Sequence, residues 1–361
     1  MKRIYIVSCL ILFCLSISAQ HRESEDILKK LQWNDEMLNI FIDTRVDLQS
    51  QFEGGDLDNA GFKGQTIRIW LAGEVMPGIR YRVRHRLNKA QDPLIRDNYS
   101  SATDQAWIAF DLKDWTITVG KQSMQLGTFE YDYNGADLYL STMVNGDFDM
   151  YKTGVNVAYE VAGQTLNLQV VNSDAPQFAS EEYKKKAFAA NFLWAGSLFD
   201  KKLRTRWGYG LLQHDKSEFY NWLTLGVQVN LRKFITELDY FMGDRNIDYG
   251  SVVGDNELGL RLVHDQSAAL TLRYCPGKWH FSVKGVWNLR HDKNDDRDAY
   301  NGTGTQAAVE YYPFTKDLMK DLRFHMAYVY NKTEFKGRFS SLADKDVRTI
   351  LMGTRWLFKA K

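Results

Sequence analysis

The sequence predicts an all-β protein, a transmembrane antiparallel β-barrel of about 16 strands. Three observations predict this fold class. Apolar and polar side chains alternate in short stretches along the chain, which is the period of a strand with one apolar and one polar face. No apolar stretch of about 18 residues follows the N-terminal segment, so a membrane-spanning helix is not expected. Short and long connections alternate between the stretches, which is typical of hairpins in an outer-membrane barrel.

The N-terminus has the layout of a secretory signal peptide. Lys2 and Arg3 precede an apolar run, and the run leads to Ser-Ile-Ser-Ala, which suits cleavage after Ala19. The apolar run is too short to span a membrane comfortably as an anchor. The expected divisions of the chain are a signal peptide at residues 1–19, a polar periplasmic lead at 20–35 and the barrel at 36–361.

Sixteen alternating stretches follow this lead. In the first of them, Leu38, Ile40 and Ile42 share one parity, whereas Asn39 and Asp43 share the other. The later stretches repeat this pattern. The strands expected after the first are 62–75, 78–89, 103–112, 115–121, 150–160, 164–171, 186–196, 202–213, 223–231, 233–242, 258–275, 278–290, 304–312, 321–331 and 347–358.

We expect the short turns to face the periplasm and the long loops to be extracellular. The long connections include "EGGDLDNAG", "HDKSEFYN" and "HDKNDDRDAYNG", and residues 122–149 form an extended third loop. Lipid offers the backbone no hydrogen-bond partners, and a closed barrel satisfies every backbone group without leaving an edge. Four tryptophans near strand ends are expected at the membrane interface, where aromatic rings are favoured: Trp115, Trp222, Trp279 and Trp356.

The third stretch, "GIRYRVRHRLNK", carries four arginines at alternate positions: Arg80, Arg82, Arg84 and Arg86. Like charges in one row repel, and burying them is costly. If the apolar parity faces lipid, the arginines line a water-filled lumen, with successive guanidinium groups about 7 Å apart. Water then screens the repulsion, and a row of equivalent sites lets an anion step from one to the next. The planar guanidinium fork suits phosphate-like anions.

These features resemble the phosphate-selective porin O and P family of sixteen-stranded outer-membrane porins. The resemblance lies in the signal peptide, in "GFKGQTIRIWLAGEV" and the arginine stretch, and in "AWIAFDLKDWTITVGKQSM" before the third loop. Its specific motifs cover about residues 60–125. It implies a trimer that passes small anions through an arginine-lined pore, with the third loop folded into the lumen. This chain departs from the family after "GK", where it reads "GKQSMQLGTFEYDYNGADLY" and lacks the usual small residues and proline.

Further cations share the lumen-facing parity or are expected to line the pore: Arg68, Lys121, Arg204 and Arg206. Acids of the third loop are expected at the constriction: Glu130, Asp132 and Asp137. Two interpretations stay open. Either the arginines confer anion selectivity, or they pair with these acids, as in general porins whose arginine wall faces an acidic loop. Lysines 184–186 in a long loop either collect anions at the mouth or are simply solvated.

The expected function is passive diffusion of small, phosphate-like anions through an outer-membrane porin, with lipid, small anions and further copies of the chain as partners. The alternatives are a non-selective or other solute-specific porin and, from another class, a secreted soluble β-sheet protein that binds glycans. A barrel lipase needs a serine–histidine pair facing lipid, and no serine can be assigned to His85. The sequence lacks GxSxG, HExxH and a Gly-rich phosphate loop, so we expect no enzyme, cofactor, metal or nucleic-acid partner.

The composition places further limits. Of 3 cysteines, only Cys275 remains beyond the signal peptide, so an internal disulfide or a structural zinc cluster is not expected. The chain has 46 Lys and Arg against 45 Asp and Glu, and loss of Lys2 and Arg3 leaves 44 basic residues. Because the mature chain is nearly neutral, any electrostatic preference must come from where its charges lie.

Overall fold

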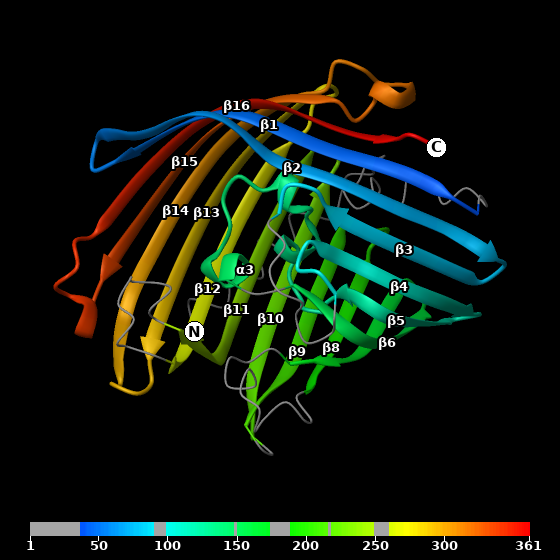
Figure 1. Cartoon of the computed structure of the whole chain (residues 1–361), viewed down its shortest axis with the longest axis horizontal. Coiled ribbons are helices and arrows are strands. Elements are labelled where there is room, and N and C mark those ends of the chain that lie inside the picture. Colours follow the sequence, from blue (N-terminus) through cyan, green and yellow to red (C-terminus); the bar gives the residue numbers. More distant parts are fainter. Residues whose placement is uncertain (1–36, 90–98, 148–149, 174–187, 216–217, 249–259) are drawn as a thin grey trace.

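The computed structural model describes residues 37–89, 99–147, 150–173, 188–215, 218–248 and 260–361. Over these residues, 16 antiparallel strands close into a barrel in which each strand pairs with its neighbours in sequence and β16 pairs with β1 (Figure 1). The predicted fold class is confirmed. The predicted signal peptide, the lead that follows it and the lysines at 184–186 lie outside the described residues.

The strands and helices have the following bounds. The strands are β1 (Asn39–Glu53), β2 (Asp56–Met76), β3 (Ile79–Arg86), β4 (Thr103–Leu112), β5 (Trp115–Ser123), β6 (Tyr151–Val161), β7 (Gln164–Asn172), β8 (Phe188–Leu198), β9 (Leu203–Asp215), β10 (Glu218–Leu231), β11 (Phe234–Asp248), β12 (Leu260–Tyr274), β13 (Trp279–Asp292), β14 (Arg297–Tyr311), β15 (Arg323–Phe335) and β16 (Lys345–Lys359). The helices are α3 (Met143–Asp147) and the 3₁₀ turns η1 (Glu130–Asp132), η2 (Gly135–Asp137), η5 (Asp317–Met319) and η6 (Gly337–Phe339).

The two faces of the sheet have opposite character. On β1, Asp43, Arg45 and Asp47 are buried on the inside, whereas Val46 and Leu48 are exposed on the outside, as the alternation predicts. Exposed apolar side chains continue around the barrel: Val83, Ile108, Val119, Leu168, Leu270, Val283, Met326 and Met352. A polar inside and an apolar outside suit a barrel surrounded by lipid. Among the described residues, no helix has the length and apolar character needed to cross a membrane.

Strands β1 and β16 form the seam that closes the barrel. Their ladder runs from Phe41 opposite Lys359 to Glu53 opposite Val347. At its end, the backbone N–H of Ile40 donates to the carbonyl of Lys361 at 2.9 Å. Closure leaves no strand edge whose unpaired groups would face lipid.

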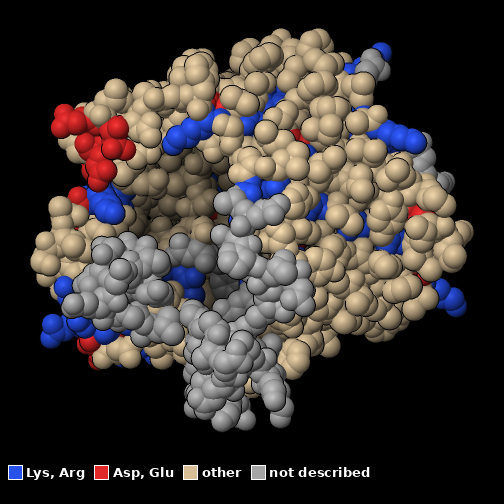
Figure 2. Space-filling model, in the orientation of Figure 1, with Lys and Arg blue, Asp and Glu red and all other residues tan. Residues whose placement is uncertain are grey.

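The first predicted loop is a hairpin turn instead. "EGGDLDNAG" is strand on both sides of Gly54 and Gly55, whose φ angles are 59° and 104°. Glycine adopts positive φ readily, so two residues suffice to reverse the chain. The hairpin tip carries the exposed acids Glu53, Asp56 and Asp58. Acidic side chains gather at the left of Figure 2, where the tip of this hairpin lies in Figure 1.

Two other predicted loops are also short. Strand β9 ends at Asp215 and β10 begins at Glu218, while β13 ends at Asp292 and β14 begins at Arg297. The strands therefore extend into "HDKSEFYN" and "HDKNDDRDAYNG". Strand extensions beyond the membrane need no apolar face, so their polar sequences look like loops.

The third loop, described at residues 124–147, folds into the barrel as the resemblance implies, and α3 lies inside the ring of strands in Figure 1. Its residues Met124, Leu126 and Val144 pack against Trp222 and Phe241 of the wall. Further along the loop, Leu140 packs on Ala269, Val286 and Val329 from other strands of the wall. The loop therefore crosses the lumen.

The interfacial position predicted for Trp222 is wrong. Its side chain is 1% exposed and donates its Nε1–H to the carbonyl of Asp244 at 2.9 Å. It has the opposite parity to Leu225 and Leu231, which face outward, so it packs against the third loop instead of lipid. Trp115 and Trp279 are about half exposed on the outside, as expected.

The seam gives a test of closure. A Cβ added to Gly353 would lie 2.3 Å from the carbonyl oxygen of Val46 on β1. We expect Gly353→Ala to destabilise the barrel by roughly 1–3 kcal/mol, because overpacking forces the two strands apart. The measurement is denaturant unfolding in micelles. Gly285→Ala is the matched control, because its Cβ would meet no atom within 4 Å. Equal stability of the two variants would contradict tight packing at the seam.

Candidate functional site

Cations gather on the lumen side of one part of the barrel, which we call the basic wall: Arg68, Arg80, Arg82, Arg84, Arg86, Lys121 and Lys152. It is built from β2, β3, β5 and β6. On β3 the arginines alternate with outward-facing residues such as Val83, so the ladder predicted from "GIRYRVRHRLNK" faces the interior. Arg82 packs over Trp107, with its guanidinium carbon 5.6 Å from the ring centroid.

Asp104 lies among three of these guanidinium groups. Its carboxylate is 2.8 Å from Nε of Arg86, 3.3 Å from Nε of Arg84 and 3.8 Å from Nε of Arg68. The carboxylate is almost fully buried, with 1% of its side chain exposed. Three cations sharing one carboxylate leave this part of the wall with excess positive charge.

A register shift places Asp104 inside. In the ladder between β3 and β4, Arg84 is opposite Gln105 and His85 is opposite Thr103, so Asp104 is the extra residue of a bulge. Strict alternation would turn Asp104 outward, together with Ile108. The bulge re-aims the side chain into the lumen. Sequence reasoning missed this residue because a bulge leaves no periodic signal.

Two arginines of the ladder are fixed by further contacts. Arg80 makes two hydrogen bonds to the carboxylate of Asp111, at 2.5 and 2.7 Å, and Thr116 donates to the same carboxylate at 2.8 Å. Arg84 donates to the hydroxyl of Tyr151 at 2.5 Å. These contacts fix the direction of the guanidinium groups, although they also use some of their donors.

Lys121 reaches the interior by a different route. Gly120, with φ of 122°, interrupts the alternation of β5, and both Lys121 and Gln122 are buried. The ammonium of Lys121 lies 5.7 Å from the ring centroid of Tyr99. Lys121 therefore lies on the basic wall.

The acids of the third loop meet cations elsewhere on the barrel. Glu130 pairs with Lys284 at 2.9 Å, and Asp132 pairs with Arg206 at 2.8 Å. Lys284 is on β13 and Arg206 on β9, so neither belongs to the basic wall. These two predicted constriction acids are thus compensated away from the arginine ladder.

The predicted pore cations Arg204 and Arg206 lie beneath the loop. The guanidinium carbon of Arg204 is 5.7 Å from the ring centroid of Phe129, and Nε of Arg206 donates to the carbonyl of Thr128 at 3.1 Å. The structure thus separates the predicted cations into two groups. Those of β2, β3 and β5 form the basic wall, whereas those of β9 hold the loop.

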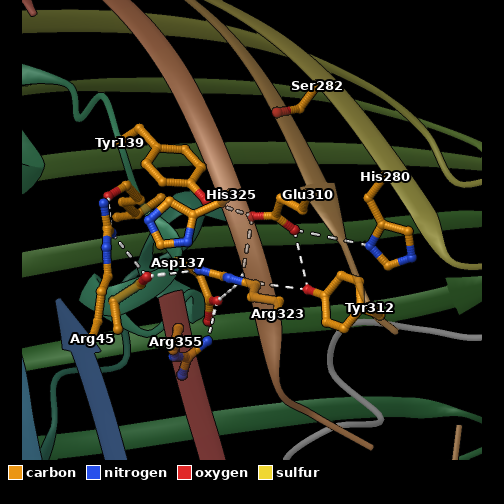
Figure 3. Close-up of polar contacts among 12 residues, drawn as sticks. Arg45, Asp137, Tyr139, His280, Ser282, Glu310, Tyr312, Arg323, His325 and Arg355 are labelled. Carbon is orange, nitrogen blue, oxygen red and sulfur yellow. Dashed lines mark hydrogen bonds and ion pairs between the residues drawn. The ribbon is translucent and has the colours of Figure 1, made fainter. Parts of the chain in front are cut away.

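Asp137 lies between Arg323 and Arg355 (Figure 3). It accepts from Nη1 of Arg323 at 2.6 Å and from Nη1 of Arg355. Burial alone would raise the pKa of this carboxyl, but the charges and hydrogen bonds of the two arginines outweigh it and hold the pKa at about 2. At neutral pH the loop is therefore held by a charged carboxylate.

Glu310 extends this cluster toward His280 and Tyr312 (Figure 3). It accepts hydrogen bonds from the hydroxyls of Tyr139 at 2.8 Å and Tyr312 at 3.1 Å, and it lies 3.4 Å from Nη1 of Arg323. The ring of His280 is 3.9 Å away. A cavity of about 130 Å³ lies against the loop here, and its lining includes Tyr139, His280, Glu310 and Arg323.

Backbone groups of the loop are also bonded to the wall. Asp239 accepts from the N–H groups of Phe129 and Glu130 at 2.8 and 2.9 Å. On the other side, Arg45 donates to the carbonyls of Ala136 and Leu138 at 3.0 and 3.2 Å. Buried backbone groups need such partners, so the loop has a defined position in the lumen.

The described side chains of the site offer charges and hydrogen-bond donors for binding and steering. The described residues contain no group of histidine, cysteine and acidic side chains arranged to hold a metal ion. Nδ1 of His85 lies 3.1 Å from Oγ1 of Thr103 and so has a threonine, not a serine, as its hydroxyl neighbour. A fixed row of guanidinium groups facing a lumen can bind and pass anions.

Comparison with known proteins agrees with this architecture. Residues 38–244 match the family model described as phosphate-selective porin O and P. A search of the curated proteins finds no significant match.

Solved structures resemble the barrel at low sequence identity. The outer membrane channel DcaP of Acinetobacter baumannii matches with a TM-score of 0.67 at 11% identity, covering 89% of this chain and 97% of that one. OmpF of Salmonella typhi, solved with daunomycin, gives 0.61 at 12%, with 89% and 97% covered. The trimer form of OmpT of Vibrio cholerae gives 0.60 at 12%, with 90% and 100% covered. At these identities the likeness concerns the fold.

The Asp137 contacts predict a pH dependence of the loop. Because the folded pKa, about 2, is below the ordinary value of 3.8, the ionised carboxyl stabilises the loop fully above about pH 3.8. This stabilisation is lost as the pH falls through 2. We expect the unsubstituted protein to show larger, noisier single-channel currents only near pH 2, where Asp137 becomes protonated. The Asp137→Asn variant should show such currents already at neutral pH. Asp114→Asn, at an exposed turn, is the control. A transition of the unsubstituted channel near pH 4 would contradict the assignment.

Replacing Asp104 is expected to shift ion selectivity toward anions, whereas loss of an arginine should shift it toward cations. Asp104→Asn leaves three guanidinium groups without their shared carboxylate, so the chloride-to-potassium permeability ratio should rise roughly twofold or more. The barrel should also become easier to unfold. Reversal potentials under a KCl gradient measure the first effect and denaturant unfolding the second. Asp111→Asn is the matched comparison, with a smaller expected change because this carboxylate binds only Arg80 of the wall in the contacts described above. An unchanged ratio would contradict excess positive charge at Asp104.

Proposed function

This chain belongs to the phosphate-selective porin O and P family, and we propose that it carries small, phosphate-like anions by passive diffusion through its lumen. As a member of a porin family, it is an outer-membrane channel rather than an enzyme. The proposal concerns what the channel selects and which residues select it.

The observation that carries the proposal is the sharing of Asp104 by Arg68, Arg84 and Arg86 on the basic wall. An anion near these groups meets more positive than negative charge. Guanidinium groups can also donate pairs of parallel hydrogen bonds to a phosphate oxyanion, which an ammonium group cannot. Because the arginines alternate along β3, an anion has successive sites about 7 Å apart.

The position of the third loop supports the same proposal. Its acids were the candidates for cancelling the arginine ladder. Glu130 binds Lys284, Asp132 binds Arg206, and Asp137 binds two further arginines, so each acid has a cationic partner outside the ladder. The loop then narrows the lumen without neutralising the basic wall. In this proposal the ladder selects anions and the loop limits their size.

Three further assignments belong to the proposal. Residues 1–19 are a signal peptide that is removed on export, residues 20–35 are a periplasmic lead, and residues 36–361 form the barrel. The working form is a homotrimer, which is supported by the trimeric form of a structural relative. Phosphate itself is the anion we favour, because the arginine fork matches its geometry.

The ladder gives the direct test. Replacing Arg82 and Arg84 together by glutamine should lower the chloride-to-potassium permeability ratio of the purified channel roughly threefold or more, because two charged sites are lost from the row. Phosphate added to one side should reduce the chloride current of the unsubstituted channel and have less effect on the variant. Planar-bilayer reversal potentials and current block measure both.

Arg348→Gln is the matched control, since this half-exposed arginine lies toward the long-loop end of β16 and pairs with Asp346 at 3.3 Å. It should leave both readouts unchanged. Cation preference of the unsubstituted channel would overturn the proposal. Anion preference without block by phosphate would keep an anion channel but reject phosphate, and equal effects of the control and the double variant would remove the ladder from selectivity.

A further inference from the structure

The outside of the barrel carries a groove on the lipid-facing side of β11 to β15. Its volume is about 590 Å³, which falls within the range of about 300–1,000 Å³ usual for ligand pockets. Its floor includes Ala307 of β14, which lies between Val283 of β13 and Tyr328 of β15 in the register. Phe281 and Met326 extend the two sides. The small alanine side chain between larger neighbours makes the surface concave.

A row of aromatic rings lies at the short-turn end of this groove. Phe234 stacks on Tyr274 with ring centroids 4.5 Å apart, and Tyr274 is 6.4 Å from Phe281. Trp279 continues the row and is 4.5 Å from Tyr311. Aromatic rings at strand ends favour the level of the lipid headgroups. The groove therefore extends from the headgroup level toward the middle of the bilayer.

Cations occupy the turns just beyond the aromatic row. Arg232 and Lys233 precede Phe234, and Lys278 precedes Trp279. Lys233 and Lys278 are exposed, and Nζ of Lys278 donates to the carbonyl of Pro313 at 2.6 Å, which uses one of its three hydrogens. Backbone hydrogen bonds of 2.8 Å tie these turns to their neighbours, from Cys275 N to Lys233 O and from Tyr312 N to Lys278 O.

The neighbouring connection adds to this positive charge. Residues 312–322 contain the exposed lysines Lys316 and Lys320 together with two acids, Asp317 and Asp321. With Arg232, Lys233 and Lys278, the turns around the groove hold five cations against these two acids. An apolar groove that ends at a cationic rim is complementary to an amphiphile with an anionic head.

We propose that this groove binds an anionic phospholipid of the periplasmic leaflet. An acyl chain lies over Ala307 between β13 and β15, and the phosphate lies beside Lys233 and Lys278. The apolar contact and the ion pairs act on the same molecule, so binding depends on both. The inference rests on the outer-membrane position with short turns toward the periplasm, but it is independent of anion selectivity in the lumen.

The rim favours a lipid over a second copy of the chain. Lysine is depleted at protein–protein interfaces, because its hydrated ammonium is costly to bury there. At the headgroup level the same ammonium stays in water while it attracts phosphate. The aromatic row also matches a bilayer interface, where rings are half immersed.

Native mass spectrometry of the delipidated full-length protein gives the test. The probes are phosphatidylglycerol and phosphatidylcholine with identical acyl chains, each added at equal concentration. Phosphatidylglycerol should be retained preferentially, and Lys233→Gln with Lys278→Gln should reduce that preference roughly tenfold. Ala307→Phe, which fills the groove, should reduce retention of both lipids. The matched control is Lys113→Gln with Lys201→Gln, which removes two exposed lysines from other short turns.

Each outcome of these experiments supports or overturns the inference. Equal retention of the two lipids, or equal effects of the two lysine pairs, would overturn the inference. If Ala307→Phe instead dissociates an oligomer without changing lipid retention, the groove is a protein interface and the inference is wrong. Bilayer conductance recorded on the same variants separates this inference from the proposed function. If the Lys233 and Lys278 variant loses the lipid preference but keeps normal anion selectivity, the result supports the groove and leaves the proposed function unaffected. If the unsubstituted channel has no anion selectivity but still retains phosphatidylglycerol, the proposed function is wrong and the inference about the groove stands.

Discussion

Backbone hydrogen bonding is the constraint on which this structure depends. Lipid supplies no donors or acceptors, so each strand must pair on both sides, and the ladder between β1 and β16 completes the ring. Closure then separates the side chains by parity, with apolar groups outside and polar groups inside. Asp43, Arg45 and Asp47 on β1 are buried because the closed ring leaves their parity no other place. The polar lumen is thus a consequence of pairing as much as of function.

A polar lumen must also balance its charges. The third loop meets this need by binding its acids to Lys284, Arg206, Arg323 and Arg355, and these contacts hold the loop across the lumen. The same ion pairs therefore fix the position of the third loop and balance the charges of its acids. The basic wall is left outside this set and shares Asp104 instead. The excess charge of the wall therefore depends on where the loop acids lie, and their ion pairs are with cations outside the arginine ladder.

The sequence predicts the strands and their inward parity well, because alternation is a local signal that lipid imposes on each strand. It fails where that signal is absent or interrupted. The strand extension at Gly54 has exposed side chains on both faces, and the bulge at Asp104 turns one side chain inward without changing the composition. The partners of the loop acids were also beyond reach, since Glu130 and Lys284 are 154 residues apart along the chain. The inward position of Trp222, by contrast, follows from parity, and a general preference of tryptophan for interfaces was the wrong guide.

Net charge conceals how this protein uses its cations. The chain is nearly neutral, with 46 basic and 45 acidic residues, yet arginine and lysine are placed according to their chemistry. Arginines form the ladder inside the barrel. The guanidinium group is planar, weakly hydrated and charged at any physiological pH, so it can lie close to its neighbours and can donate hydrogen bonds to an oxyanion. Lysines dominate the exposed short turns beside the groove, where a hydrated ammonium suits water and headgroups. Exchanging the two residue types would keep the net charge and lose both arrangements, so the electrostatic field in the lumen and at the short turns is set by side-chain geometry at each place.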